Sequence, residues 1–556
     1  MDFTLPSVVA HNLTVRDIAG VAVAGTSIQL RLSNTWSGTP TTFGSVTVGT
    51  QQSGATIVPG SIVPVTFSGS RSVTVPAGGR VTSDPVVMAV HAGEQLAVSL
   101  SVVGPAAVSV HYCCEGRIDS YATANGVGDQ TANPAAASFV FADVNMRWLS
   151  AIAVAGTAAQ GTVVAFGDSI TEGFNNNVAG YGWPSSLQQR VTQLPPSQQV
   201  ALVNEAISGN TLTVFPPGST FAATSGGLPG VTRLAPDALS LPGVKDVVLF
   251  LGTNDIWFGA GGENTARPIT SYGTAAAIEA AMQTVIAQTH AAGIKIFGVT
   301  LLPRSSFIGG NGENPEVWSP ADQATLAAVN AWILSPGSGF DGTINLAAVM
   351  GDVYNGACQP DTPFAPYFTD DNLHPNLAGQ TVMADAIPTS LFGIPEAPQV
   401  PQPLAVTLTP GCPAAMVAAQ VLALAQAPTA PPATTPTTST PPLTTQPHRR
   451  IASHPVGARH TVLAVLAVLI TLIALAVVAL LVVLRRRAVQ QRRRRRALNR
   501  PAGPEARPPR PVSVAASSPD GGFSVSRRQE EAASVLPDRS PPMGTGTGGT
   551  PPHSGW

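Results

Sequence analysis

The sequence has 556 residues, of which only 11% are charged, and its formal net charge is −2. Because this length exceeds that of a typical single domain, the chain is expected to hold several domains. The charge is divided unevenly: residues 1–448 contain 12 Lys and Arg against 26 Asp and Glu, whereas residues 449–556 contain 17 against 5. A basic tail can signal nucleic-acid binding. Here the arginines adjoin a long apolar segment, so we expect no nucleic-acid partner.

Residues 1–157 contain short runs in which apolar and polar residues alternate, separated by Gly, Pro, Ser and Asn. These runs cover residues 27–32, 45–48, 62–67, 72–75 and 96–102. The pattern predicts an all-β sandwich or jelly-roll domain. Such a domain could bind carbohydrate or could simply pack against its neighbour, and packing is the interpretation we favour.

In residues 158–395, strand-like runs alternate with helical ones, which predicts a parallel sheet with helices on both faces. The predicted strands cover residues 163–166, 200–204, 246–251, 294–300 and 343–345. The predicted helices cover residues 183–193, 274–292, 320–334 and 377–389. Ser319 and Pro320 form a good helix start, with serine as the N-cap and proline at the first helical position.

Residues 461–484 are apolar except for two threonines. At about 1.5 Å per residue, a helix of this length spans a bilayer. Eight arginines follow at 485–487 and 492–496, against three at 449, 450 and 459. The positive-inside rule therefore predicts a single-pass membrane protein with a cytoplasmic C-terminus and with residues 1–460 outside the cell.

The flanks of this helix have biased compositions. Residues 396–460 are predicted to form a Pro/Thr-rich stalk, and residues 485–556 a disordered Arg/Pro-rich tail whose arginines contact anionic lipid headgroups.

Residues 1–6 lack the basic and apolar parts of an export signal. Either the membrane helix exports the large domain unaided or a signal peptide is missing from this sequence. We favour a misplaced start.

Four cysteines occur, at Cys113, Cys114, Cys358 and Cys412. Outside the cell they could form disulfides, with Cys358 and Cys412 tying the end of the domain to its body. Adjacent cysteines such as Cys113 and Cys114 rarely bond to each other, and the spacing fits no metal site. Unpaired buried thiols are an equal alternative.

Candidate catalytic residues follow the predicted strands. Residues 163–173 read Val-Val-Ala-Phe-Gly-Asp-Ser-Ile-Thr-Glu-Gly, which places Ser169 where a buried strand ends. Such a serine lies beside free backbone N–H groups, a suitable place for a nucleophile, although Gly-Asp-Ser alone more often marks a turn. Gly209 follows the second strand and can direct its N–H at a substrate oxygen. Asn254 follows the third strand, and its amide can donate a second hydrogen bond.

The last candidate pair, Asp371 and His374, precedes the final predicted helix. A separation of three residues in a tight loop lets the carboxylate reach Nδ1–H of the imidazole, which leaves Nε2 to face Ser169. Each residue also has a structural interpretation, as a turn, a cap or a surface group. All of them lie in order at strand ends, where the loops of a parallel sheet meet, and this favours a shared catalytic role.

These motifs resemble those of the SGNH, or GDSL, hydrolase family. The matching segments are Gly-Asp-Ser-Ile at 167–170, Ser-Gly-Asn at 208–210, Gly-Thr-Asn-Asp at 252–255 and Asp-x-x-His-Pro at 371–375. The resemblance covers about residues 158–392. It implies a flavodoxin-like three-layer α/β/α domain at 158–395 and a serine esterase mechanism.

By this resemblance Ser169 is the nucleophile, His374 the general base and then acid, and Asp371 its orienting group. The oxyanion hole is formed by the backbone N–H groups of Ser169 and Gly209 and by the Asn254 side chain. The neighbouring Asp370 fits the family spacing less well. Two N-terminal segments, at 28–34 and 73–85, also resemble the β-domain of a secreted actinobacterial branch of the family. This resemblance implies a Gram-positive surface protein.

The predicted function is therefore that of a membrane-anchored extracellular serine ester hydrolase, a carboxylesterase, acetylesterase or lipase, that needs no cofactor or metal. Expected substrates are acylated glycans or short-chain lipid esters. Aromatic residues near the predicted site could line an acyl pocket, stack on a sugar or anchor loops; they are Phe174, Phe215, Trp257, Phe258 and Phe307. The alternative is a surface carbohydrate-binding or adhesion protein on an inactive scaffold.

Overall fold

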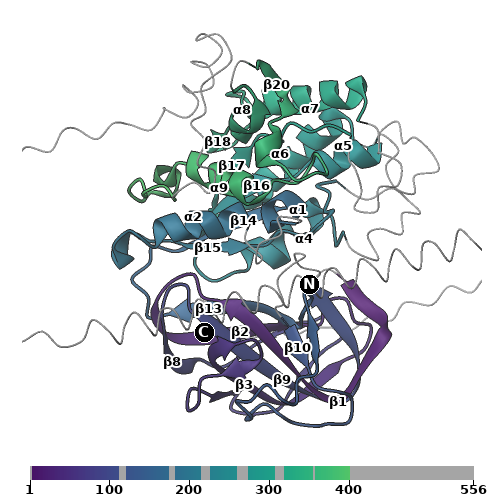
Figure 1. The fold of residues 1–556 in the computed structure, drawn as a ribbon, viewed down its shortest axis with the longest axis vertical. Coiled ribbons are helices and arrows are strands. Elements are labelled where there is room, and N and C mark those ends of the chain that lie inside the picture. Colours follow the sequence, from purple (N-terminus) through teal and green to yellow (C-terminus); the bar gives the residue numbers. More distant parts are fainter. Residues whose placement is uncertain are drawn as a thin grey trace, which may run out of the picture. The chain divides into compact units, whose positions relative to one another are not determined.

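The structure is a computed structural model, and it describes residues 3–111, 120–174, 182–213, 226–259, 273–306, 318–354 and 357–400. All of these residues belong to one compact unit, Met1–Thr434. Figure 1 shows its strands and helices, with colours that follow the sequence.

The N-terminal part is built from antiparallel strands. A nine-stranded sheet has the order β11-β10-β1-β9-β3-β4, with β5, β6 and β12 paired at its sides, and a second sheet has the order β13-β2-β7, with β8 on β2. The strands are β1 (Phe3–Gly20), β2 (Gly25–Ser33), β3 (Thr41–Ser53), β4 (Thr56–Ile57), β5 (Val63–Val65), β6 (Val73–Val75), β7 (Arg80–Thr82), β8 (Val86–Val90), β9 (Gln95–His111), β10 (Ser120–Ala122), β11 (Phe141–Asp143), β12 (Met146–Arg147) and β13 (Leu149–Ala155). The predicted N-terminal β-rich region is confirmed.

Both sheets contribute to one apolar core, because the alternation of each strand turns every second side chain inward. Leu30 of β2, Val48 of β3 and Leu100 of β9 are fully buried in it. The longest strand, β1, was not predicted from the sequence. Its pairing with β9 shifts register twice, between Leu5 and Val9 and again near His11, and such bulges interrupt the alternation that a strand prediction needs.

The second half of the unit contains a parallel sheet. Its strand order is β15-β14-β16-β17-β18, the order of flavodoxin-like folds. The strands are β14 (Thr162–Gly167), β15 (Ala201–Asn204), β16 (Val244–Phe250), β17 (Lys295–Val299) and β18 (Gly342–Ile344). Each predicted strand of this region is present with ends shifted by at most two residues.

Helices pack against this sheet (Figure 1). The long ones are α2 (Trp183–Val191), α6 (Ala275–Ala291), α7 (Pro320–Ile333) and α9 (Leu377–Ala386). At the start of α7, Ser319 is the N-cap and Pro320 follows it, as the sequence indicated. Ser319 also forms a reciprocal capping box with Asp322, which was not predicted. The prediction for α9 was too long: the helix ends at Ala386 because Ile387 is extended, as the residue before a proline usually is.

Several short elements were not predicted. They are α1 (Ser169–Glu172), α4 (Gly230–Arg233) with the π-helical turn Leu234–Leu239 after it, α5 (Thr253–Gly259), α8 (Leu346–Met350), and the hairpin of β19 (Gly351–Asp352) and β20 (Gln359–Pro363). Most are a single turn long, too short for a helical period to show in the sequence.

Some predictions concern residues outside the described ranges. Among the described residues, no helix is both long and apolar enough to cross a bilayer; the predicted membrane helix at 461–484 and the tail at 485–556 are not among them. Cys358 is disulfide-bonded. Cys358 is the only cysteine within the described ranges, so the pairing of Cys358 with Cys412 stays a prediction.

Candidate active site

The end of β14 presents Ser169. Asp168 caps the α1 turn, and its carboxylate accepts the N–H of Ile170 at 3.0 Å. A Cβ on Gly167 would lie 2.2 Å from the Thr171 hydroxyl oxygen, so the chain can turn this tightly only with glycine there. Ser169 thus occupies the first helical position after a buried strand, and 7% of its surface is exposed.

Three of the predicted residues form a continuous chain of hydrogen bonds. Ser169 Oγ lies 2.9 Å from His374 Nε2, and His374 Nδ1 lies 2.7 Å from Asp371 Oδ2. All three side chains are buried. The Asp371 carboxylate accepts the hydrogen on Nδ1 of His374. Nε2 therefore carries no hydrogen and can accept a proton from the serine hydroxyl.

The loop that carries this pair is closed on itself. The N–H of Thr369 donates to the carbonyl of His374 at 2.8 Å, and Phe368 pairs with Pro375. Asn372, between the two site residues, has a φ of 63°, a left-handed conformation that asparagine tolerates better than most residues. This tight turn brings carboxylate and imidazole together across three residues.

Asp371 is held in its ionised form. Burial raises the pKa of its carboxyl, but the hydrogen bond and charge of His374, with the N–H groups of His374 and Leu373 at 2.9 Å each, outweigh burial and hold the pKa well below its usual range. The neighbouring Asp370 is exposed. The structure therefore brings Asp371, and not Asp370, into the chain of hydrogen bonds.

The two other predicted residues lie on adjoining loops. Gly209 follows β15 and has a φ of 72°, which favours glycine. Asn254 lies in the first turn of α5, after β16. Its amide Nδ2 donates to the carbonyl of Asn210 at 3.0 Å and, more weakly, to Asp168 Oδ2 at 3.4 Å. Asn254 therefore connects the loop of Gly209 to the turn that carries Ser169.

Two further carboxyl groups are fully enclosed near these loops. Burial raises the pKa of Asp168 to about 7, against the opposing effect of the Ile170 N–H. Burial also raises the pKa of Asp255 to about 6, although its oxygens accept hydrogen bonds from Thr213 and from the N–H of Leu212. Asp255 thereby fixes the chain beyond Gly209. In the described part of the chain, no cluster of His, Cys, Asp and Glu could hold a metal ion.

Sequence reasoning missed Arg233 of α4, which is 1% exposed. Its guanidinium donates to Asn210 Oδ1 at 2.9 Å, to the Gly167 carbonyl at 2.9 Å and to the Glu205 carbonyl at 2.6 Å. It also lies 3.9 Å from the centroid of the Phe166 ring. No motif in the sequence marks a lone arginine in an unpredicted turn, so only the structure reveals that it joins the two site loops.

Residues 165–382 match the model of the GDSL-like lipase/acylhydrolase family. The chain carries a GDSL-like acylhydrolase domain. The match confirms the predicted family and the predicted activity as an ester-hydrolysing enzyme. The acylhydrolase domain contains the parallel sheet and each site residue named above.

The acylhydrolase domain is also similar to solved structures. One is an acetylxylan esterase from Geobacillus stearothermophilus (19% identity, 42% of this chain and 95% of that chain, TM-score 0.29). Others are an aryl esterase from M. smegmatis (17%, 42% and 99%, TM-score 0.30) and a GDSL-like lipase from Bacteroides thetaiotaomicron (18%, 42% and 89%, TM-score 0.29). No curated protein matches the sequence.

Proposed function

We propose that the acylhydrolase domain cleaves carboxylic esters by a serine mechanism. His374 Nε2 takes the proton of Ser169 as Oγ attacks the ester carbonyl, and Asp371 orients and stabilises the resulting imidazolium. His374 then gives the proton to the leaving alcohol, and a water molecule releases the acyl group by the same steps. The observation that carries this proposal is the unbroken hydrogen-bond chain from Ser169 Oγ to Asp371.

The oxyanion hole of this mechanism consists of the backbone N–H groups of Ser169 and Gly209 and the amide of Asn254. Donors fixed in advance stabilise the negative oxygen of the tetrahedral intermediate without reorganisation. The Asn254 amide has one good hydrogen bond and one of 3.4 Å to Asp168. The longer bond is the one that an oxyanion would replace.

We propose a small acyl group as the preferred substrate. The ring of Phe174 lies 4.8 Å from the ring of His374, tilted by 54°, so an aromatic wall stands directly beside the general base. Such a wall favours a short acyl chain or a sugar ring. Phe215 and Phe307 are outside the described residues. Phe258 of α5 is buried and packs against Trp257, so it anchors this helix.

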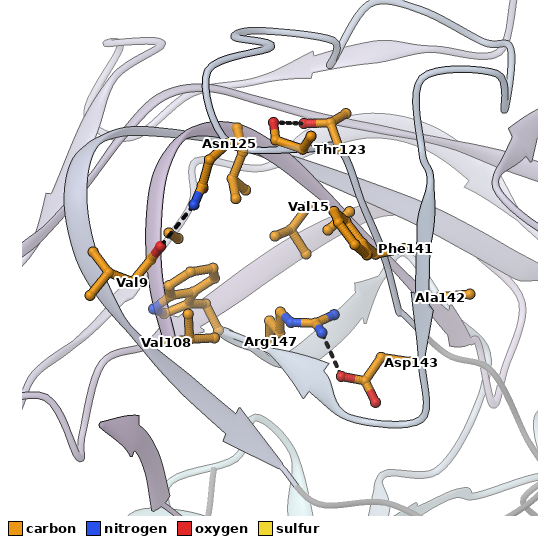
Figure 2. Close-up of a pocket in the computed structure, with 14 residues that line it drawn as sticks. Val9, Val15, Val108, Thr123, Asn125, Phe141, Ala142, Asp143 and Arg147 are labelled. Carbon is orange, nitrogen blue, oxygen red and sulfur yellow. Dashed lines mark hydrogen bonds and ion pairs between the residues drawn. The ribbon is translucent and has the colours of Figure 1, made fainter. Parts of the chain in front are cut away.

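The alternative of a carbohydrate-binding protein has little support in the N-terminal region. Figure 2 shows residues that line a cavity there. The volume of this cavity is about 430 Å³. Its wall is mainly aliphatic, including Val9, Val15 and Val108. Asn125 already donates to the carbonyl of Val9, and Arg147 pairs with Asp143 at 2.5 Å. A cavity of this kind suits an apolar group better than a hydroxyl-rich sugar.

We further propose the domain order and location that the composition favours: a β-sandwich at 1–157, a three-layer hydrolase domain at 158–395, a stalk at 396–460 and a single membrane helix at 461–484, with the enzyme outside the cell. Full-length protein, expressed with an export signal, is expected to stay with the membrane after washing at high pH. A chain ending at residue 460 is expected to be released. Release of both would contradict the anchor.

The mechanism is tested by hydrolysis of p-nitrophenyl acetate, butyrate and palmitate by the full chain, with and without a fluorophosphonate that reacts with activated serines. We expect the fastest turnover on acetate or butyrate. Peptide mapping should find the label on Ser169 alone. Hydrolysis that continues after complete labelling, or a label on another serine, would contradict the serine mechanism.

A further inference from the structure

Two buried, charged side chains, those of Glu172 and Arg233, bond to the residues on either side of Gly209. Its neighbour Ser208 donates its hydroxyl hydrogen to Glu172. Its other neighbour, Asn210, accepts from Arg233 at 2.9 Å. The peptide that would supply an N–H to the oxyanion hole is therefore held from both ends, and both holding groups are almost fully enclosed.

The first of these side chains connects to the N-terminal β region. Glu172 belongs to α1, the turn that begins with Ser169, and is 2% exposed. One carboxylate oxygen accepts from Ser208, and the other lies 3.2 Å from Nε2 of His111. His111 is the last residue of β9. A strand of the β region thus reaches the carboxylate that joins the turn of Ser169 to the loop of Gly209.

The second side chain connects to the same region by another path. Asp237 lies 3.8 Å from Arg233 and 2.6 Å from Arg80. Arg80 begins β7, which pairs with β2 in the second β-sheet. His111 of the first β-sheet therefore contacts a carboxylate that bonds directly to one neighbour of Gly209. Arg80 of the second β-sheet contacts a carboxylate that reaches the other neighbour through Arg233.

These contacts have energetic weight because the two carboxylates are largely buried, whereas the side chains of His111 and Arg80 are each 24% exposed. A carboxylate removed from water is costly unless donors or a cation compensate it. His111 compensates Glu172, and Arg80 compensates Asp237. Without them, Glu172 and Asp237 would tend to turn toward water, and this change would relax the hold on Ser208 and Arg233.

We infer that the N-terminal β region acts as a positioning element for catalysis, with His111 and Arg80 fixing the Gly209 loop from two sides so that the oxyanion donors are set before substrate binds. This inference rests on the proposed serine mechanism. His111 and Arg80 touch no reacting atom, so they are positioning residues. Their effect should appear in transition-state stabilisation and not in ground-state binding.

The test uses the full chain with His111→Gln, Arg80→Ala and the double variant. Gln can still donate a hydrogen bond to Glu172, which guards against loss of folding, but it lacks the imidazole ring. Matched controls are His91→Gln and Arg71→Ala, which change exposed residues of the same β region. The readouts are kcat and KM for p-nitrophenyl acetate, Ki for phenylboronic acid, and the thermal unfolding midpoint. The boronic acid forms a tetrahedral adduct with Ser169 Oγ and so measures the oxyanion hole.

We expect each single variant to lower kcat by about 10-fold and the double variant by about 100-fold, which approaches the loss of one oxyanion donor. Ki should rise by the same factors, while KM stays within about twofold and the controls match wild type. Folded variants with unchanged kcat and Ki would overturn the inference. So would losses that track a lowered unfolding midpoint or a raised KM. If wild type neither hydrolyses the ester nor binds the boronic acid, the serine mechanism itself fails.

Discussion

Replacement of Ser169 by alanine is expected to lower kcat for p-nitrophenyl acetate by at least about 10⁴-fold, because no other group at this position can form the acyl intermediate. The side chain is small and only 7% exposed, and loss of its hydroxyl leaves Asp168 and the α1 turn in place. The thermal unfolding midpoint should therefore stay close to that of wild type.

A second variant shows whether Ser169 and His374 work as one unit. His374→Ala alone, and the double variant with Ser169→Ala, should each be about as slow as Ser169→Ala, because residues that act in one step do not contribute additively. Multiplicative losses in the double variant would mean that the two side chains contribute separately. That result would contradict the proton transfer between them.

Asp371→Asn is expected to lower kcat by about 10⁴-fold at neutral pH. The asparagine amide would turn toward Nδ1 and favour the wrong imidazole tautomer, so Nε2 would carry a proton and could no longer accept one from Ser169. The matched control is Asp370→Asn, one residue earlier and exposed, which should keep wild-type kcat. Equal losses in the two variants would contradict the assigned role of Asp371.

The same carboxyl predicts how stability depends on pH. Its pKa is lower in the folded chain than in the unfolded chain. The unfolded state therefore binds more protons in the acidic range, so this group stabilises the fold above its unfolded pKa. That contribution is lost as pH falls through the folded pKa. Asp371→Asn should unfold with a weaker acid dependence than wild type, measured by thermal melts at several pH values.

The sequence allowed the parallel sheet to be predicted well because its strands are buried runs of Val, Ile, Leu and Phe between recognisable helices. β16, for example, differs from its prediction by two residues at its start. The candidate site could also be predicted, because each of its residues belongs to a short local pattern. These residues are Ser169, Gly209, Asn254, Asp371 and His374. Local patterns can be recognised without knowledge of distant contacts.

Residues that act through distant partners could not be predicted in this way. Arg233 bonds to carbonyls at Gly167 and Glu205, which are 66 and 28 positions away. In the sequence, Glu172 looks like an ordinary acidic residue in a polar turn, and only the fold places it between His111 and Ser208. The strand β1 was missed for a different reason, because its bulges interrupt the alternation of apolar and polar residues.

The tight packing around Thr171 limits where this enzyme can be altered. A Cβ on Gly167 would lie 2.2 Å from its hydroxyl oxygen, and a Cβ on Gly182 would lie 2.1 Å from its carbonyl oxygen. Two separate glycines thus enclose one threonine, and neither takes part in bond breaking. Directed evolution of substrate range should therefore leave both glycines unchanged. It should instead diversify Phe174, whose ring lies beside the imidazole of His374.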